Sequence, residues 1–125
     1  MKRIAILAAG LALAAGPALA HHGTSQYDFT KEIPLTGQVR EYSYGDPHIW
    51  LWLVVPGAGG KSQEWSLEGP PLAYGRGRGW AGDSLKVGQK VNVAMSPLRD
   101  GTPGGIILTV TDTNGKVLLE RGRRF

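Results

Sequence analysis

The chain has 125 residues, 14 of them basic and 10 acidic, with a formal net charge of +4 and no cysteine. This length suits one domain of ordinary size. The absence of cysteine excludes disulfides, thiolate zinc sites and iron–sulfur clusters, so any metal would be held by histidine, carboxylate, methionine or backbone donors.

The first twenty residues have the pattern of an export signal. A positive start precedes an apolar run over 4–15, and Ala18-Leu19-Ala20 is a small-residue cleavage site. We therefore expect a signal peptide at residues 1–20, a periplasmic or secreted mature protein, and no transmembrane anchor, because the apolar run is short for a bilayer. The remaining chain has twelve basic and ten acidic residues, a net charge of +2, which gives no argument for a nucleic-acid partner.

The mature chain divides into an arm, a domain and a tail. Residues 21–31 are polar and aperiodic, which predicts a mobile N-terminal arm, residues 32–120 form the domain, and residues 121–125 form a basic C-terminal tail. Within the domain, runs of β-branched and aromatic residues alternate with Gly, Pro, Asn and Asp clusters, which indicates strands. We expect these strands at 33–43, 48–55, 62–68, 88–96, 105–111 and 116–120.

A glycine- and proline-rich segment at 70–80 interrupts this β pattern. Pro70-Pro71 can open a short helix, but the glycines at 75, 77 and 79 disfavour a long one. The order is then three strands, a short helix or irregular turn, and two or three strands. This order is typical of a small OB-like barrel of five or six antiparallel strands. A small β-sandwich is the main rival.

The second strand shows its two faces in the sequence. Alternation places Ile49 and Leu51 on the core side and His48, Trp50 and Trp52 on the other side. Applied to the later strands as well, it predicts that the core includes Ile49, Leu51, Leu53, Val91, Val93, Ile106, Leu108 and Val110.

Histidines occupy the candidate metal positions. Cleavage after Ala20 would leave His21 with two nitrogen donors, its α-amine and its imidazole, and His48 could supply a third nitrogen in a brace that suits Cu(II). His22 is a competing donor for a purely local chelate, and Asp46 would support His48 or act as a weak axial group. The alternative is that the arm frays and that His48 only caps a backbone carbonyl in its turn.

Aromatic and basic residues form a second candidate site. Trp50 and Trp52 lie on the strand whose counterpart in OB-folds carries stacking platforms for ligands. The alternative is that the arm or the 70–80 segment covers them, because two bare tryptophans would form an unusual apolar patch. Arg76 and Arg78 could bind an anion or a partner protein, although arginines in such a segment ordinarily lie in a solvated loop.

Several ordered features resemble a known family. They are His21-His22 after the cleavage site, Leu35-Thr36-Gly37-Gln38-Val39, Asp46-Pro47-His48 before an aromatic strand, and Asp83-Ser84-Leu85-Lys86-Val87-Gly88. With these, the chain resembles a family of small exported bacterial proteins catalogued as a domain of unknown function, DUF6152, in which the histidine turn usually reads Asn-Pro-His. The resemblance implies an exported β-domain and no established activity.

Three classes of function follow. The leading hypothesis is an exported periplasmic binding protein that holds copper through His21, His48 and His22. The alternative is a metal-free OB-like interaction module that uses Trp50 and Trp52 to bind a small molecule or an envelope protein. The third class is a redox enzyme built on the same brace. Other kinds of enzyme are not expected, because nothing in the spacing of the carboxylates and serines singles out catalytic residues.

Overall fold

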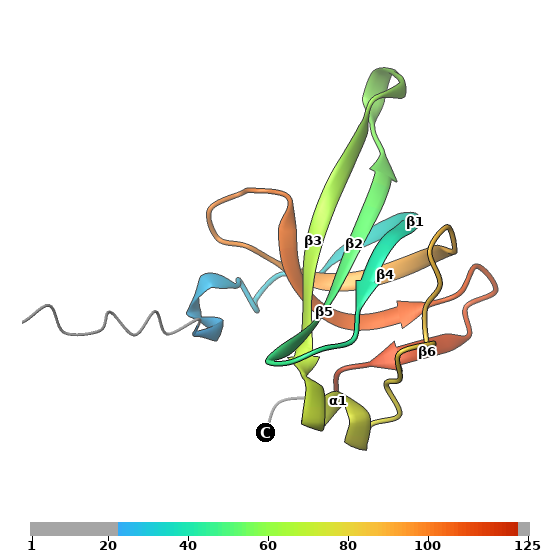
Figure 1. Cartoon of the computed structure of the whole chain (residues 1–125). Coiled ribbons are helices and arrows are strands. Elements are labelled where there is room, and N and C mark those ends of the chain that lie inside the picture. The colour runs from blue at the N-terminus through green and yellow to red at the C-terminus, as the bar shows by residue number, and fades with distance from the viewer. Residues whose placement is uncertain (1–22, 123–125) are drawn as a thin grey trace, which may run out of the picture.

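The computed structural model describes residues 23–122, so the predicted signal peptide, His21, His22 and the last three residues lie outside the described part (Figure 1). All six predicted strands are present. The elements are η1 (Thr24–Gln26), β1 (Ile33–Ser43), β2 (His48–Pro56), η2 (Ala58–Gly60), β3 (Ser62–Pro71), α1 (Leu72–Gly77), β4 (Lys90–Pro97), β5 (Gly104–Thr111) and β6 (Val117–Glu120). Among the described residues, none of the helices is both long and apolar enough to cross a bilayer.

The strands close into a barrel. β1 pairs with β2 on one side and β4 on the other, β2 pairs with β3, and β4 pairs with β5. These pairs are antiparallel, and a parallel pairing of β3 with β5 closes the ring. β6 adds an antiparallel strand to β5, and α1 lies between β3 and β4 in the chain. The expected OB-like barrel is therefore confirmed, with one closing pair that is parallel.

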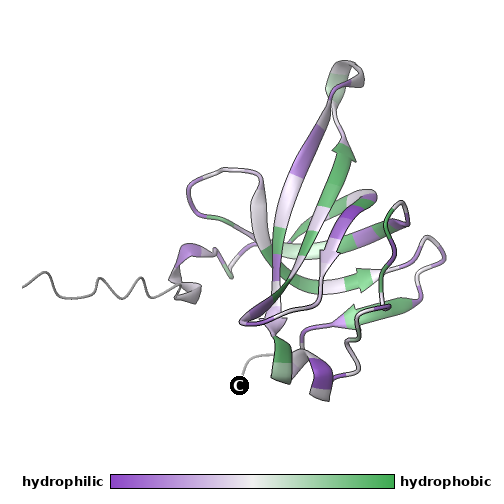
Figure 2. Ribbon diagram, in the orientation of Figure 1, coloured by the Kyte–Doolittle hydropathy of each residue, from purple (hydrophilic) through white to green (hydrophobic). Residues whose placement is uncertain are grey.

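The core follows the alternation of the sequence. Ile49, Leu51 and Leu53 are fully buried on β2, and Val91 and Val93 on β4 are at most 1% exposed. Figure 2 shows apolar residues along β2, whereas the part of β3 farthest from α1 is hydrophilic. Both observations fit one closed sheet with its apolar side inward, and the sandwich alternative is not observed.

One predicted core residue is wrong, and a β-bulge explains it. Ala94 pairs with Thr109 and the next residue, Met95, pairs with Ile107, so Leu108 is an extra residue in β5. A bulge of this kind shifts the alternation by one position. Ile107 is consequently fully buried in the core cluster, while Leu108 is only half-buried.

The segment after α1 covers one end of the barrel. Trp80 is 2% exposed, and its indole Nε1 donates to the backbone carbonyl of Glu120, 3.2 Å away. The Tyr44 hydroxyl donates to the Trp80 carbonyl at 2.9 Å, and the Tyr42 hydroxyl donates to the Ala81 carbonyl at 3.0 Å. These bonds connect the α1–β4 segment to β1 and β6.

The described part of the arm lies on the barrel. Tyr27 forms a bridge with Leu98 and is 3% exposed, and the backbone N–H of Asp28 donates to the Pro97 carbonyl at 2.8 Å. The start of the predicted tail is also paired, since the Arg121 N–H donates to the Leu108 carbonyl at 2.9 Å. Residues 24–28 of the predicted arm are therefore attached to the barrel by a buried aromatic ring and by backbone hydrogen bonds.

Candidate functional site

A buried carboxylate connects the arm to the predicted histidine. Oε1 of Glu68 contacts Nδ1 of His48, and Oε2 of Glu68 accepts a hydrogen bond from the Tyr27 hydroxyl. The Glu68 side chain is 7% exposed, whereas the His48 side chain is 28% exposed. The three groups form one chain that runs from the interior toward the surface.

The pairing of β2 with β3 positions this cluster. Trp50 pairs with Glu68, and His48 pairs with Pro71, so an irregularity in the register lies between the two pairs. His48 follows Asp46-Pro47, a turn whose peptide bond is cis. Because side chains alternate along β2, His48 and Trp50 share the outer face of the barrel with Glu68.

The hydrogen bonds indicate which nitrogen of His48 can bind a ligand. The Tyr27 hydroxyl donates to one oxygen of Glu68, and Nδ1 of His48 contacts the other. Nδ1 is therefore engaged by the carboxylate, and Nε2 is the ring nitrogen that remains for a ligand. Burial raises the pKa of Tyr27 well above its ordinary value, and the hydrogen bond from Tyr27 to Glu68 raises it further, so the hydroxyl keeps its proton and its donor role.

The carboxylate that supports His48 is Glu68 rather than Asp46. Asp46 is exposed in the turn before the strand, whereas Glu68 comes from the neighbouring strand and reaches Nδ1 directly. Within residues 23–122, no three histidine or carboxylate residues form a group that could hold a metal ion. The other predicted nitrogen donors, His21 and His22, lie outside the described residues.

The two tryptophans form a stacked pair. The ring centroids of Trp50 and Trp52 are 6.0 Å apart, and their planes differ by 26°. Both residues are half-buried, so they are neither bare nor fully covered. They lie directly after His48 on the same face of β2, as expected.

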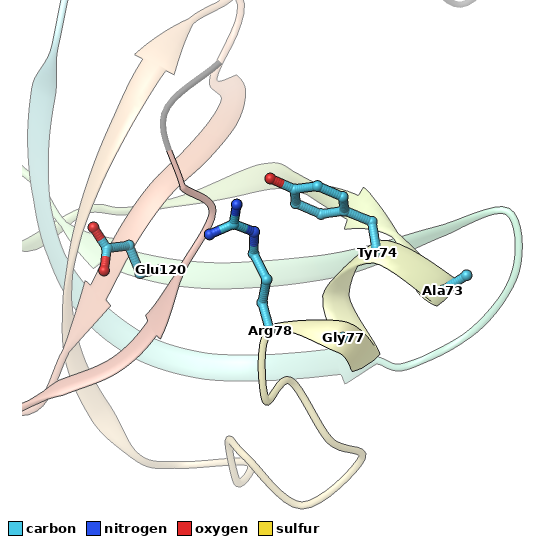
Figure 3. Close-up of a pocket in the computed structure, with 5 residues that line it drawn as sticks. All are labelled: Ala73, Tyr74, Gly77, Arg78 and Glu120. Atoms are coloured by element: carbon cyan, nitrogen blue, oxygen red, sulfur yellow. The ribbon is translucent and has the colours of Figure 1, made fainter. Parts of the chain in front are cut away.

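The two arginines lie elsewhere. The Arg78 guanidinium lies 4.9 Å from the centroid of the Tyr74 ring, and Arg76 is exposed near the end of α1. Figure 3 shows Arg78 between Tyr74 and Glu120 in an open pocket of about 710 Å³. The pocket combines one cation with one carboxylate, so it has no charge preference that would select an anion.

Sequence reasoning missed the two residues that orient His48. Tyr27 and Glu68 are 41 positions apart, and a glutamate on the outer face of a strand is ordinarily solvated. The only signals were Tyr27 in an otherwise polar arm and Glu68 directly before the Gly69-Pro70 break. Neither indicates that the arm returns to β3.

Comparisons with known proteins identify the family. A search of curated proteins finds no significant match. A crystal structure of the mitochondrial single-stranded DNA-binding protein of S. cerevisiae is similar, with a TM-score of 0.49, 10% identity, and coverage of 72% of this chain and 95% of that chain. The model of a family of unknown function, DUF6152, matches residues 8–108. The chain therefore belongs to the DUF6152 family.

Proposed function

We propose that this protein is an exported copper-binding protein in which Nε2 of His48 and the amine and imidazole of a mature N-terminal His21 hold the ion. The observation that carries this proposal is the contact between Nδ1 of His48 and the buried Glu68. Histidines that bind metals characteristically donate their second ring nitrogen to a carboxylate or carbonyl, which fixes the tautomer and the ring orientation. The partial exposure of His48 leaves room for a ligand.

The anchoring of the arm supports the participation of His21. Tyr27 bonds to the same carboxylate as His48, and His21 lies only six positions before Tyr27. A chain of six residues reaches at most about 20 Å when fully extended. The new amino terminus would therefore be tethered within about 20 Å of Tyr27, which bonds to the carboxylate that also contacts His48.

The donor set favours copper over the other common ions. Two imidazoles and an amine are nitrogen ligands of the type that Cu(II) prefers, and copper leads the divalent affinity order. Calcium and magnesium prefer oxygen ligands. His22 stands as a fourth nitrogen donor or as a competitor for a local chelate.

A competitive Cu(II) titration of the mature protein tests the proposal. His48→Ala should weaken binding by more than tenfold, because one of three nitrogen donors is lost. One extra residue ahead of His21 should weaken it as well, because the α-amine moves away from its imidazole. If His21 and His22 formed a purely local chelate, His48→Ala would leave the copper affinity unchanged.

Two further variants test whether Glu68 affects copper affinity by orienting His48 or only through its negative charge. Glu68→Gln should lower copper affinity by roughly 10–100-fold, the usual effect of losing a partner that orients a metal-binding histidine. Asp46→Asn removes a nearby exposed charge and restores the usual Asn-Pro-His sequence, so the affinity should stay within about twofold. Equal losses in both variants would attribute the effect to charge alone.

A further inference from the structure

We propose that the outer face of β2 around Trp50 and Trp52 is a binding platform for a neutral saccharide. This site adjoins the proposed copper site and shares His48 and Glu68 with it at one end, but it does not require the metal. The proposal rests on the tryptophan pair, on the polar groups that surround it and on the charge of those groups.

The aromatic pair offers an ordered surface. The nearly parallel rings with centroids 6.0 Å apart are in the range of offset stacking, so each indole limits the motion of the other. Both side chains remain partly accessible on the outside of a closed barrel whose core they do not join. A rigid, partly exposed aromatic surface loses little conformational entropy when a ligand binds.

A pair of polar residues lies at each end of the platform. Beside Trp50, the Glu68 carboxylate contacts His48. Beyond Trp52, Nε of Arg40 lies 2.5 Å from Oε2 of Glu64. Arg40 belongs to β1 and Glu64 to β3, the strands on either side of β2, so this ion pair crosses the outer face of β2.

The groups beside the rings are hydrogen-bonding residues. Trp52 pairs with Glu41 on β1 and Ser66 on β3, and Trp50 pairs with Ser43 on β1. The Arg40 and Glu64 side chains are 46% and 47% exposed, and exposed ion pairs are weak. Their polar atoms can therefore turn toward ligand hydroxyls at little cost.

The charge of this face selects the class of ligand. The charged groups around the rings are paired: Arg40 contacts Glu41 and Glu64, and Glu68 contacts His48. Paired charges of this kind form no basic patch to hold a polyanion such as nucleic acid or an acidic lipid surface. A neutral sugar fits, because its C–H face can lie on the negative face of an indole while its hydroxyls donate to carboxylates and serines.

The test is a titration of mature, EDTA-treated protein with three soluble oligosaccharides: chitohexaose, cellohexaose and maltohexaose. Tryptophan fluorescence and isothermal calorimetry report binding, and a 20-residue oligothymidylate serves as the polyanion. We expect saturable binding of at least one oligosaccharide that changes less than twofold between 50 and 500 mM salt. Bound sugar should also protect tryptophan from acrylamide quenching.

Variants locate the site. Trp50→Ala and Trp52→Ala should each weaken binding by at least tenfold. Tyr74→Ala, which removes an exposed aromatic ring from α1, should leave it within twofold. Trp52→Phe, which keeps an aromatic ring, should give an intermediate loss and covers the case in which the alanine variant does not fold.

Three results would overturn the proposal: no oligosaccharide binds, the tryptophan variants bind as well as the wild type, or oligothymidylate binds in a salt-dependent manner instead. Because the titration uses metal-free protein, a failure here is distinct from a failure of copper binding.

Discussion

Replacing Tyr27 with phenylalanine removes the hydrogen bond to Glu68, one of the bonds that attach the arm to the barrel. The change removes one hydroxyl and keeps the ring, which is 3% exposed. The acceptor, Glu68, is 5% exposed, so water cannot readily replace the lost donor. A hydrogen bond to a charged group contributes about 1.5–3 kcal/mol, and for a domain of this size that loss should lower Tm by roughly 6–24 °C.

The pH dependence of the same variant gives an independent check. Burial raises the pKa of Tyr27 above its ordinary value of 10.0, so the folded state holds this proton more tightly than the unfolded state. The stabilisation is therefore complete below pH 10 and is lost as the pH rises from 10 toward the higher folded value. Burial also raises the pKa of Tyr42 to about 12, but that residue is present in both proteins and its contribution cancels.

Thermal and urea denaturation of wild-type protein and Tyr27→Phe between pH 7 and pH 11 measures both effects. The difference in unfolding free energy should be largest near pH 7 and should shrink above pH 10. An unchanged Tm, or a difference that stays constant up to pH 11, would refute the attachment of the arm through Glu68.

Three further predictions concern the core, the strand packing and the processing of the chain. Leu51→Ala should cost about 2–5 kcal/mol of unfolding free energy in urea denaturation, because the side chain is fully buried, and a much smaller loss would mean that the two faces of β2 are reversed. Gly37→Ala should cost about 1–3 kcal/mol, because a Cβ there would lie 2.6 Å from the Val54 carbonyl oxygen. Gly77→Ala is its matched control: nothing lies within 4 Å of its added carbon and the position is helical, so it should not destabilise and should stabilise by up to about 1 kcal/mol. Intact mass of the exported protein should correspond to residues 21–125, and cleavage at any other position would remove the terminal amine from the proposed copper site.

The barrel could be predicted because its determinants are local. Strand periodicity, turn residues and the glycine- and proline-rich break before Trp80 are all visible within short windows of the sequence. The closing parallel pair of β3 with β5 is not, because it depends on how the whole sheet curls. The bulge at Leu108 could not be predicted either, because an extra residue inside a continuous apolar run does not change the visible pattern of apolar and polar residues.

The candidate site was predictable only in part, for a similar reason. His48 and the tryptophan pair share one strand, so alternation alone places them on one face. The hydrogen bonds to Glu68 depend on the pairing of β2 with β3 and on the return of the arm to the barrel. Asp46 was the expected partner because it is near in sequence, whereas a neighbouring strand supplies the actual carboxylate.

Electron paramagnetic resonance of the Cu(II)-loaded mature protein tests the copper proposal most directly. Hyperfine coupling from the ligand nitrogens, together with pulsed detection of the remote imidazole nitrogens, distinguishes histidines that bind the ion. The wild type should show remote nitrogens from two bound imidazoles, of which His48→Ala loses one and keeps that of His21, and Glu68→Gln should alter the spectrum while Asp46→Asn leaves it unchanged. Identical spectra for the wild type and His48→Ala would contradict the account, because the folded domain would then contribute no ligand to the metal.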